Sequence, residues 1–240
     1  MTRLLWLPAV LRAAGLTVVE VPGWQGRGAD GIDPRVILDH HTASSRKGGD
    51  APSLNIIVKG RPDLPGPLSN VLIGRDGTCY VTAAGVSNNA GRGGSPMHGA
   101  VHNRHTIGVE IENDGIGEPW TQRLLDVCRR HDAAVCRHLG WSADRCVAHK
   151  EWATPKGRKT DPSWDQNEHR AAVARLLAPP MSEEDDVTED RIIKALLDGG
   201  RPANAIGRDE VWAWRCEALR TGDLDAVCRY ITWVEAQKPK

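Results

Sequence analysis

Residues 35–40 read RVILDH, and this short stretch decides the fold class. Its apolar side chains are continuous rather than alternating, which is typical of a strand that is buried on both faces of a sheet. Residues 106–112, TIGVEIE, alternate between apolar and small or acidic side chains and predict a second strand. Residues 17–21 are rich in β-branched side chains and predict a third. These three strands are predicted to form a sheet at the centre of the fold.

Helices and a hairpin are predicted between and after these strands. Residues 121–139 carry an apolar stripe at helical spacing that stops at Gly140, and a shorter helix is expected over residues 167–177. Residues 70–82 predict a hairpin, because NVLIG and TCYVT flank a turn in which Gly77 supplies a positive φ. Strands interleaved with helices indicate an α/β domain with a mixed central sheet flanked by helices.

Two long segments have the composition of loops: residues 44–69 are rich in Ser, Gly, Pro and Lys, and residues 83–105 in Gly, Asn and His. They are predicted to be loops, with one short element at about residues 54–59. Because binding residues concentrate on loops that a rigid scaffold holds, we expect these two loops to form the walls of a binding groove.

The chain is expected to divide into two domains. The α/β domain should cover residues 1–178, followed by a charged linker over residues 179–188. Residues 189–240 predict a small helical unit, because apolar side chains recur in them at helical spacing. About 50 residues make a marginal core alone, so docking or self-association of this unit is expected. Three tryptophans of the unit are candidates for an exposed contact, although they could also form its core: Trp212, Trp214 and Trp233.

The composition excludes some classes of protein. Basic and acidic residues balance at 31 each, which argues against a nucleic-acid-binding protein. No stretch approaches the roughly 18 apolar residues of a membrane span. Pro8 and Arg12 break the apolar start of the chain, which favours a short helix ending near Gly15 over a signal peptide. The six cysteines contain no C-x-x-C pair and are expected to be reduced and buried.

Histidines and carboxylates suggest a metal site. His40 and His41 end the continuous apolar strand, and only one of them can face a given site, because neighbouring side chains of a strand point to opposite faces. His149 and Asp161 follow much later, in and beside a polar loop. Together, His40, His149 and Asp161 supply the ligand set of a catalytic zinc with a fourth position open for water. Glu110 is the candidate for handling protons beside it.

Four separated motifs then occur in a recognisable order: VILDHHTAS, NVLIGRDGTCYVTAAG, TIGVEIEN and HKEWATPKGRKTDP. They resemble the type 2 N-acetylmuramoyl-L-alanine amidase family, which includes the peptidoglycan recognition proteins. Within this family the chain looks most like the amidase module of actinobacteriophage endolysins. The resemblance covers roughly residues 17–177 and implies the α/β fold of that family.

The resemblance also implies roles for individual residues. The three zinc ligands of the family fall on His40, His149 and Asp161, which makes Zn²⁺ the expected cofactor. The catalytic carboxylate falls on Glu110, and the lysine that stabilises the oxyanion falls on Lys159.

Several assignments have alternatives. His41 is the other candidate ligand and otherwise a core or substrate-contacting residue, and Glu112 is the other candidate base.

Asn89 is predicted to contact the substrate together with His41, but it stands where the family often has histidine, which puts its contact in doubt. Asp39 stands where an apolar residue is usual, and either accepts a hydrogen bond from a ligand imidazole or points away. Three histidines with metal-like spacing lie in a loop without a matching carboxylate: His98, His102 and His105.

The resemblance implies hydrolysis of the amide bond between N-acetylmuramic acid and the L-alanine of the stem peptide in bacterial peptidoglycan. It implies an endolysin that is made in the cytoplasm of an infected cell and then released to the cell wall, with no signal peptide, no membrane insertion and no nucleic-acid partner. Residues 189–240 are then expected to help engage the wall or a second subunit. Two alternatives are a non-catalytic peptidoglycan-binding protein and a cytoplasmic amidase that recycles soluble muropeptides.

Overall fold

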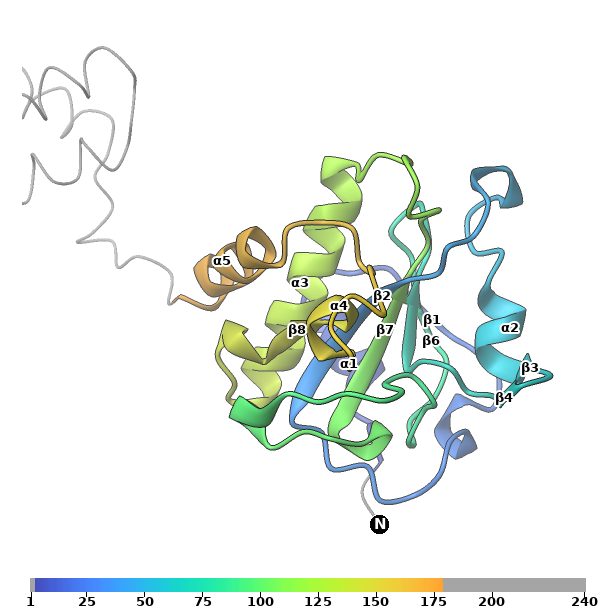
Figure 1. Ribbon diagram of the computed structural model, residues 1–240, viewed down its shortest axis with the longest axis horizontal. Coiled ribbons are helices and arrows are strands. Elements are labelled where there is room, and N and C mark those ends of the chain that lie inside the picture. Colours follow the sequence, from blue (N-terminus) through green and yellow to red (C-terminus); the bar gives the residue numbers. More distant parts are fainter. Residues whose placement is uncertain (1–2, 179–240) are drawn as a thin grey trace, which may run out of the picture. The chain divides into compact units, whose positions relative to one another are not determined.

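The computed structural model describes residues 3–178. A six-stranded sheet forms the centre of this unit, with the strand order β1-β6-β5-β7-β2-β8 (Figure 1). Every neighbouring pair is parallel except β5 and β6, which form an antiparallel hairpin. The predicted mixed central sheet is therefore confirmed. In chain order its strands are β1 (Val18–Glu20), β2 (Val36–His41), β5 (Val71–Ile73), β6 (Cys79–Val81), β7 (Thr106–Ile111) and β8 (Cys146–Ala148).

Three helices cover one face of the sheet: α1 (Leu7–Ala13), α3 (Gln122–Leu139) and α5 (Gln166–Leu177). Helix α3 contacts both α1 and α5, and buried side chains of all three share the main core with Ile37 of β2 and Val109 of β7. Smaller elements complete the domain: α2 (Leu54–Lys59), the hairpin strands β3 (Gly60–Arg61) and β4 (Leu64–Pro65), and α4 (His149–Trp152). Five short 3-10 turns span Trp24–Gly26, Arg46–Gly48, Pro96–His98, Asn103–His105 and Ala143–Arg145.

Strand β2 shows why its apolar run is continuous. Ile37 packs into the main core under the helices, whereas Val36 and Leu38 pack on the opposite face with Trp152 of α4. The strand also has a hydrogen-bonded neighbour on each side, β7 and β8. Because successive side chains alternate between the faces, Asp39 lies on the helix side and His40 on the other side.

Local end signals explain where the predicted elements begin and stop. The hydroxyl of Thr121 accepts a hydrogen bond from the backbone N–H of Leu124 and caps α3, and Gly140 ends this helix with a φ of 66°. In the β5–β6 turn, Gly77 has a φ of 86°, as predicted. The short element expected at residues 54–59 is the helix α2.

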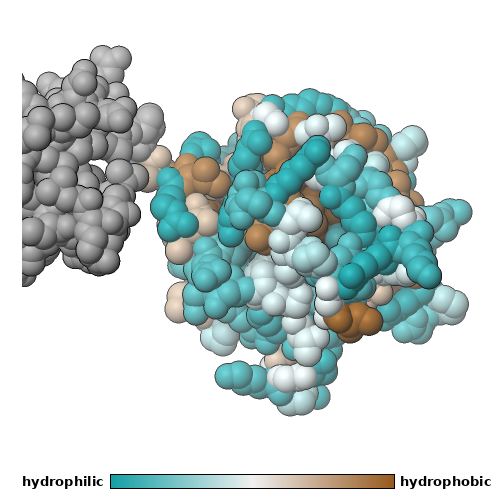
Figure 2. All heavy atoms as spheres, turned by 90° about the horizontal axis from the view of Figure 1, so that it is seen from above, coloured by the Kyte–Doolittle hydropathy of each residue, from teal (hydrophilic) through white to brown (hydrophobic). Residues whose placement is uncertain are grey.

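The apolar start of the described chain packs into the domain. Leu4, Leu7 and Leu11 are buried in the main core, so the helix predicted before Gly15 is confirmed as α1. Within residues 3–178, no helix combines the length and apolar character needed to cross a membrane. The face of the domain seen from above is mostly hydrophilic, with apolar residues in small patches between polar ones (Figure 2).

Four cysteines lie within residues 3–178, and all are buried and unbridged, as expected: Cys79, Cys128, Cys136 and Cys146. The predicted linker, the helical unit at residues 189–240 and its three tryptophans lie outside the described residues. Cys216 and Cys228 lie there too, and the proposed domain boundaries stay predictions.

Candidate metal centre

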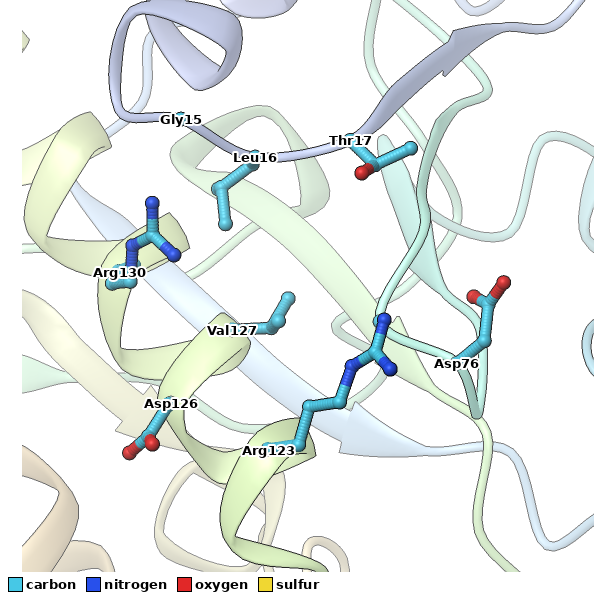
Figure 3. A pocket seen from close by; sticks show the side chains of 9 residues that line it. Gly15, Leu16, Thr17, Asp76, Arg123, Asp126, Val127 and Arg130 are labelled. Carbon is cyan, nitrogen blue, oxygen red and sulfur yellow. The ribbon is translucent and has the colours of Figure 1, made fainter.

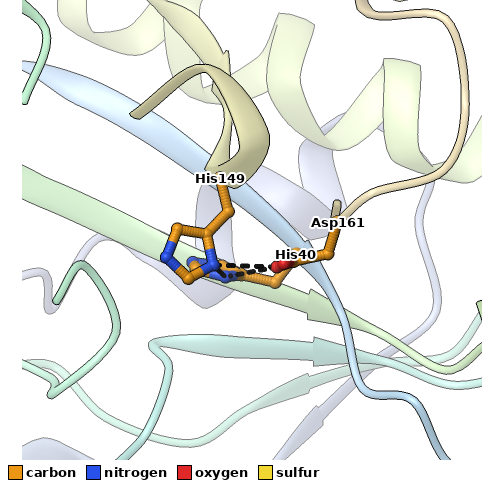
Figure 4. A group of neighbouring side chains, drawn as sticks. All are labelled: His40, His149 and Asp161. Atoms are coloured by element: carbon orange, nitrogen blue, oxygen red, sulfur yellow. Dashed lines mark hydrogen bonds and ion pairs between the residues drawn. The ribbon is translucent and has the colours of Figure 1, made fainter. Parts of the chain in front are cut away.

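Three side chains from separate segments meet where β2 and β8 end (Figure 4). His40 belongs to β2, His149 is the first residue of α4 directly after β8, and Asp161 lies in the loop before α5. The two Nδ1 atoms are 2.9 Å apart, and they lie 3.1 Å (His40) and 2.9 Å (His149) from Oδ2 of Asp161. Ligand atoms about 2.0–2.1 Å from one tetrahedral zinc ion lie roughly 3.3 Å apart. The triangle formed by Nδ1 of His40, Nδ1 of His149 and Oδ2 of Asp161 therefore has nearly the size of one face of a tetrahedral zinc site.

The chemical state of the three side chains also suits a cation. All three are buried, with at most 8% of any residue exposed. Burial lowers the pKa of His40 to about 4, so at pH 7 its imidazole is neutral and can donate a lone pair. Burial acts to raise the pKa of Asp161, but hydrogen bonds from His149 and His40 hold it well below its usual range. A carboxylate between imidazoles is the donor set that zinc accepts in catalytic sites.

The polar contacts of both rings lie on the Nδ1 side. Nε2 of His40 and Nε2 of His149 are buried and have no hydrogen-bond partner among the described residues. The Nδ1 atoms, in contrast, face each other and the carboxylate of Asp161. Two imidazole nitrogens directed at one point are the arrangement expected of two side chains that bind the same metal ion.

Strand pairing brings these distant residues together. His40 and His149 are 109 residues apart in sequence, but β2 and β8 are parallel neighbours with Asp39 opposite Ala148. The two histidines thus leave adjacent strands at the same edge of the sheet. The backbone N–H of Lys150 donates to the carbonyl of Asp161 at 2.8 Å, which closes the loop between the second and third candidate ligands.

Glu110 lies beside this triangle. It is on β7, directly opposite His40 in the parallel pairing of β7 with β2. Its Oε2 is buried and has no hydrogen-bond partner among the described residues. Burial, together with the charges of Asp161 and Glu112, raises the pKa of Glu110 to about 8. At pH 7 the carboxyl of Glu110 therefore keeps its proton in the metal-free chain. A cation held by His40, His149 and Asp161 would lower this pKa and leave a carboxylate that can act as a general base.

Glu112, the alternative base, is engaged elsewhere. It is fully buried, and its carboxylate accepts hydrogen bonds from the Thr42 hydroxyl at 2.8 Å, the Ser53 backbone N–H at 2.8 Å and the Ser53 hydroxyl at 3.1 Å. The Ser44 hydroxyl also donates to it, and the Arg75 guanidinium lies 3.6 Å away. These contacts tie the segments after β2 to the end of β7. The structure therefore favours Glu110 over Glu112.

A groove of about 380 Å³ opens over the triangle. His40, His149, Asp161 and Glu110 all line it. The loops predicted to wall a groove do so in part, through Arg61 and Leu64 of the β3–β4 hairpin and through Asn88 and Asn89. Sequence reasoning missed Arg61, Leu64 and Arg158 as individual lining residues, since a polar or apolar residue in a loop has no distinguishing pattern.

Three further predicted site residues also line the groove: His41, Lys159 and Asn89. The ring of His41 lies 6.4 Å from that of Trp120, and His41 is not part of the triangle. The positive charge of Lys159 acts on the floor of the groove, where it lowers the pKa of both His40 and Glu110.

The side-chain amide of Asn89 forms hydrogen bonds within the protein. Its Nδ2 donates to the carbonyl and the hydroxyl of Ser87, and its Oδ1 accepts from the Thr106 hydroxyl at 2.9 Å. The side chain also covers Gly108, where an added Cβ would come within 2.6 Å of it. A contact of Asn89 with substrate stays a prediction, while its internal role in the fold is clear.

A comparison with known protein families gives a match over the segment that carries these site residues. Residues 30–164, more than half of the chain, match the family described as N-acetylmuramoyl-L-alanine amidase. The matched region includes the triangle, Glu110 and Lys159. The chain belongs to the N-acetylmuramoyl-L-alanine amidase family. No curated protein gave a significant match.

Several solved structures resemble this family member. A mutant endolysin from Bacillus subtilis is 17% identical and has a TM-score of 0.48, with 66% of this chain and 99% of that chain covered. The amidase AmiD from E. coli, in complex with an anhydro-N-acetylmuramic acid peptide, is 18% identical with a TM-score of 0.46, covering 80% of this chain and 74% of that one. An AmpD derivative is 19% identical with a TM-score of 0.47, covering 65% and 93%.

Asp39 does not line the groove of the amidase. It lies on the opposite face from His40, beside Asp132 and His169, and all three are buried. Burial raises the pKa of Asp39 well above its ordinary value. Of the two alternatives for Asp39, pointing away from the ligands is therefore the correct one.

The histidine-rich loop of the amidase does not form a metal group within residues 3–178. Nε2 of His98 donates to the backbone carbonyl of Asp144 at 3.0 Å, and Nδ1 of His105 accepts from the backbone N–H of Val101. The rings of His102 and His105 lie 5.6 Å apart. His98 therefore links the loop to the turn at Ala143–Arg145, whereas His102 and His105 make contacts within the loop.

A second cavity of the amidase, about 500 Å³, lies between the segment before β1, the β5–β6 turn and α3 (Figure 3). It carries balanced charges, from Arg123 and Arg130 against Asp76 and Asp126. None of its side chains belongs to a potential metal-binding group of the described domain. It therefore lacks the potential metal-binding side chains that distinguish the groove.

Proposed function

We propose that this protein is a zinc-dependent amidase of the endolysin type, which hydrolyses the bond between N-acetylmuramic acid and L-alanine in peptidoglycan. The observation that carries the proposal is the triangle of His40, His149 and Asp161 beside the unpaired carboxyl of Glu110. A cation site and a proton acceptor thereby line one groove in a member of the amidase family.

His40, His149 and Asp161 would hold the zinc ion. When bound, zinc supplies Lewis-acid chemistry, polarising the substrate carbonyl and making water more acidic. Glu110 accepts a proton from the attacking water as the new carbon–oxygen bond forms at the lactyl carbonyl carbon. Glu110 then gives this proton to the nitrogen of L-alanine as the carbon–nitrogen bond breaks. The ammonium group of Lys159 stabilises the negative charge that develops on the carbonyl oxygen.

Product analysis tests this reaction directly. Purified peptidoglycan treated with the protein should release stem peptides with free L-alanine amino termini and leave glycan strands without peptides. Mass spectrometry should show the addition of one water per bond cut, and chelation of the metal should stop the reaction. New reducing sugar ends, or cuts within the peptide, would contradict the proposed bond.

The same assay separates the two alternatives. A non-catalytic binding protein would sediment with walls but release no product, and the unpaired carboxyl of Glu110 argues against it. A recycling amidase would cleave soluble anhydro-muropeptides and leave intact walls turbid. Loss of turbidity together with free alanine amino termini supports the endolysin role. Synthesis in an infected cell and release to the wall are part of the same proposal.

Residues 189–240 are predicted to contribute to wall engagement or self-association rather than to catalysis. All proposed site residues lie before residue 179. A chain ending at Pro180 should therefore cleave a soluble muramyl peptide at nearly the full rate. It should bind and lyse intact walls less well, or change its oligomeric state, as measured by co-sedimentation and light scattering. Unchanged wall binding and unchanged mass would contradict a role for the tail.

A further inference from the structure

One buried amide connects the three segments that carry the candidate ligands. Gln166 is the first residue of α5 and is only 3% exposed. Its Nε2 donates to the backbone carbonyl of Cys146 at 3.2 Å and to Oδ2 of Asp39 at 3.3 Å. Its Oε1 accepts from the indole N–H of Trp164 at 2.6 Å. The amide thus has a partner in β2, at the start of β8, and in the segment before α5.

The chemistry of these partners fixes the orientation of the amide. An indole N–H can only donate, and a backbone carbonyl can only accept. Oε1 must therefore face Trp164, and Nε2 must face Cys146. Because a buried polar group that loses its partner is costly, the three segments are held in one relative position.

Each partner lies close in sequence to one candidate ligand. Asp39 directly precedes His40, Cys146 begins the strand that leads into His149, and Trp164 follows Asp161 after two residues. Asp39 and His40 point to opposite faces of β2, so the amide acts from behind the sheet and lies outside the groove lining. A shift of any of these segments would change the shape of the ligand triangle.

We propose that Gln166 is a positioning residue of the metal centre, which fixes from the helix side of the sheet the mutual placement of His40, His149 and Asp161. The inference rests on the proposed zinc site. Hydrogen-bond partners that orient metal ligands typically contribute a factor of about 10–100 in metal affinity. Gln166 would supply this contribution through the backbone instead of by touching a ligand.

The test uses the full chain and Co²⁺, whose visible absorption reports ligand geometry. Gln166→Met keeps most of the side-chain length but removes all three hydrogen bonds. We expect about 10–100-fold weaker Co²⁺ binding and a changed absorption band. The matched control is Val173→Ala, because Val173 is fully buried on the same helix and lies outside the groove. This control should lose thermal stability but keep the Co²⁺ affinity and spectrum.

A second substitution covers the case in which Gln166→Met does not fold. Trp164→Phe keeps an aromatic ring and removes the indole donor to Gln166, together with part of the ring surface that packs on Trp120 and His169. Because the other two hydrogen bonds of Gln166 remain, a smaller loss of Co²⁺ affinity with a changed band is expected. Unaltered affinity and spectrum in the folded Gln166 or Trp164 variant would overturn the inference, as would an equal change in Val173→Ala. If the unsubstituted chain binds no Co²⁺ or Zn²⁺, the proposed zinc site itself fails, and this inference with it.

Discussion

Replacing His40 with alanine is expected to abolish stoichiometric zinc binding and peptidoglycan hydrolysis. The substitution removes one corner of the triangle formed with His149 and Asp161. Structural zinc sites with four ligands are worth roughly 10–16 kcal/mol, or about 3 kcal/mol per ligand, so the affinity should fall on the order of 100-fold or more. Chelator competition measures this affinity, and one zinc ion per chain is expected before the substitution.

His41→Ala is the matched control, because it changes the neighbouring imidazole on the same strand. His41 lines the groove but takes no part in the triangle, so this variant should keep its zinc. A lower rate with intact metal binding would agree with the predicted substrate contact of His41. Loss of zinc in His41→Ala alone would mean that the ligand assignment is wrong by one residue.

Glu110→Gln should keep zinc and the fold but lose hydrolysis. The amide preserves the shape of the side chain and cannot accept a proton from water, so the rate should fall on the order of 10²-fold or more. Single-turnover cleavage of a muramyl peptide, with zinc content measured on the same sample, checks both statements. Full activity in this variant would exclude Glu110 as the proton carrier.

The same substitution should stabilise the metal-free protein at pH 7. The pKa of Glu110 is about 8 in the folded chain against an ordinary value of 4.5. Between these values the unfolded chain releases the proton that the folded chain retains, so folding loses stability as the pH rises through this window. At 1.36 kcal/mol per pKa unit, Glu110→Gln should gain about 1–3 kcal/mol at pH 7 and nothing below pH 4. Denaturant unfolding at both pH values measures the difference.

Local sequence patterns predicted the elements of the fold because their causes are local. The hydrophobic period of α3, its cap at Thr121 and the glycine at its end all act within a few residues. The positive φ of Gly77 likewise depends on a turn of a few residues. In β7 the alternation of residues 106–112 predicted the strand, but every residue except Glu110 is buried, because the strand is central and covered on both faces.

The sequence by itself determined which kinds of side chain form the site, and its motifs singled out His40, His149, Asp161 and Glu110. Strand pairing brings His40 next to His149 across 109 positions of sequence, and the loop after His149 returns Asp161 to the same place. No local pattern encodes such a pairing, since the chain between the strands has no fixed length or composition.

Within each neighbouring pair the motifs favoured one residue, and only the tertiary structure supplied the physical reason. Alternation along a strand separates Asp39 from His40, but only packing shows that Asp39 faces Asp132 and the amide of Gln166. Glu110 and Glu112 share a face in the sequence pattern, yet Glu112 alone meets hydroxyl and backbone donors from a segment 59–70 residues away. A carboxylate with donors is a structural anchor and one without them can carry a proton, and that difference lies in the partners, not in the residue.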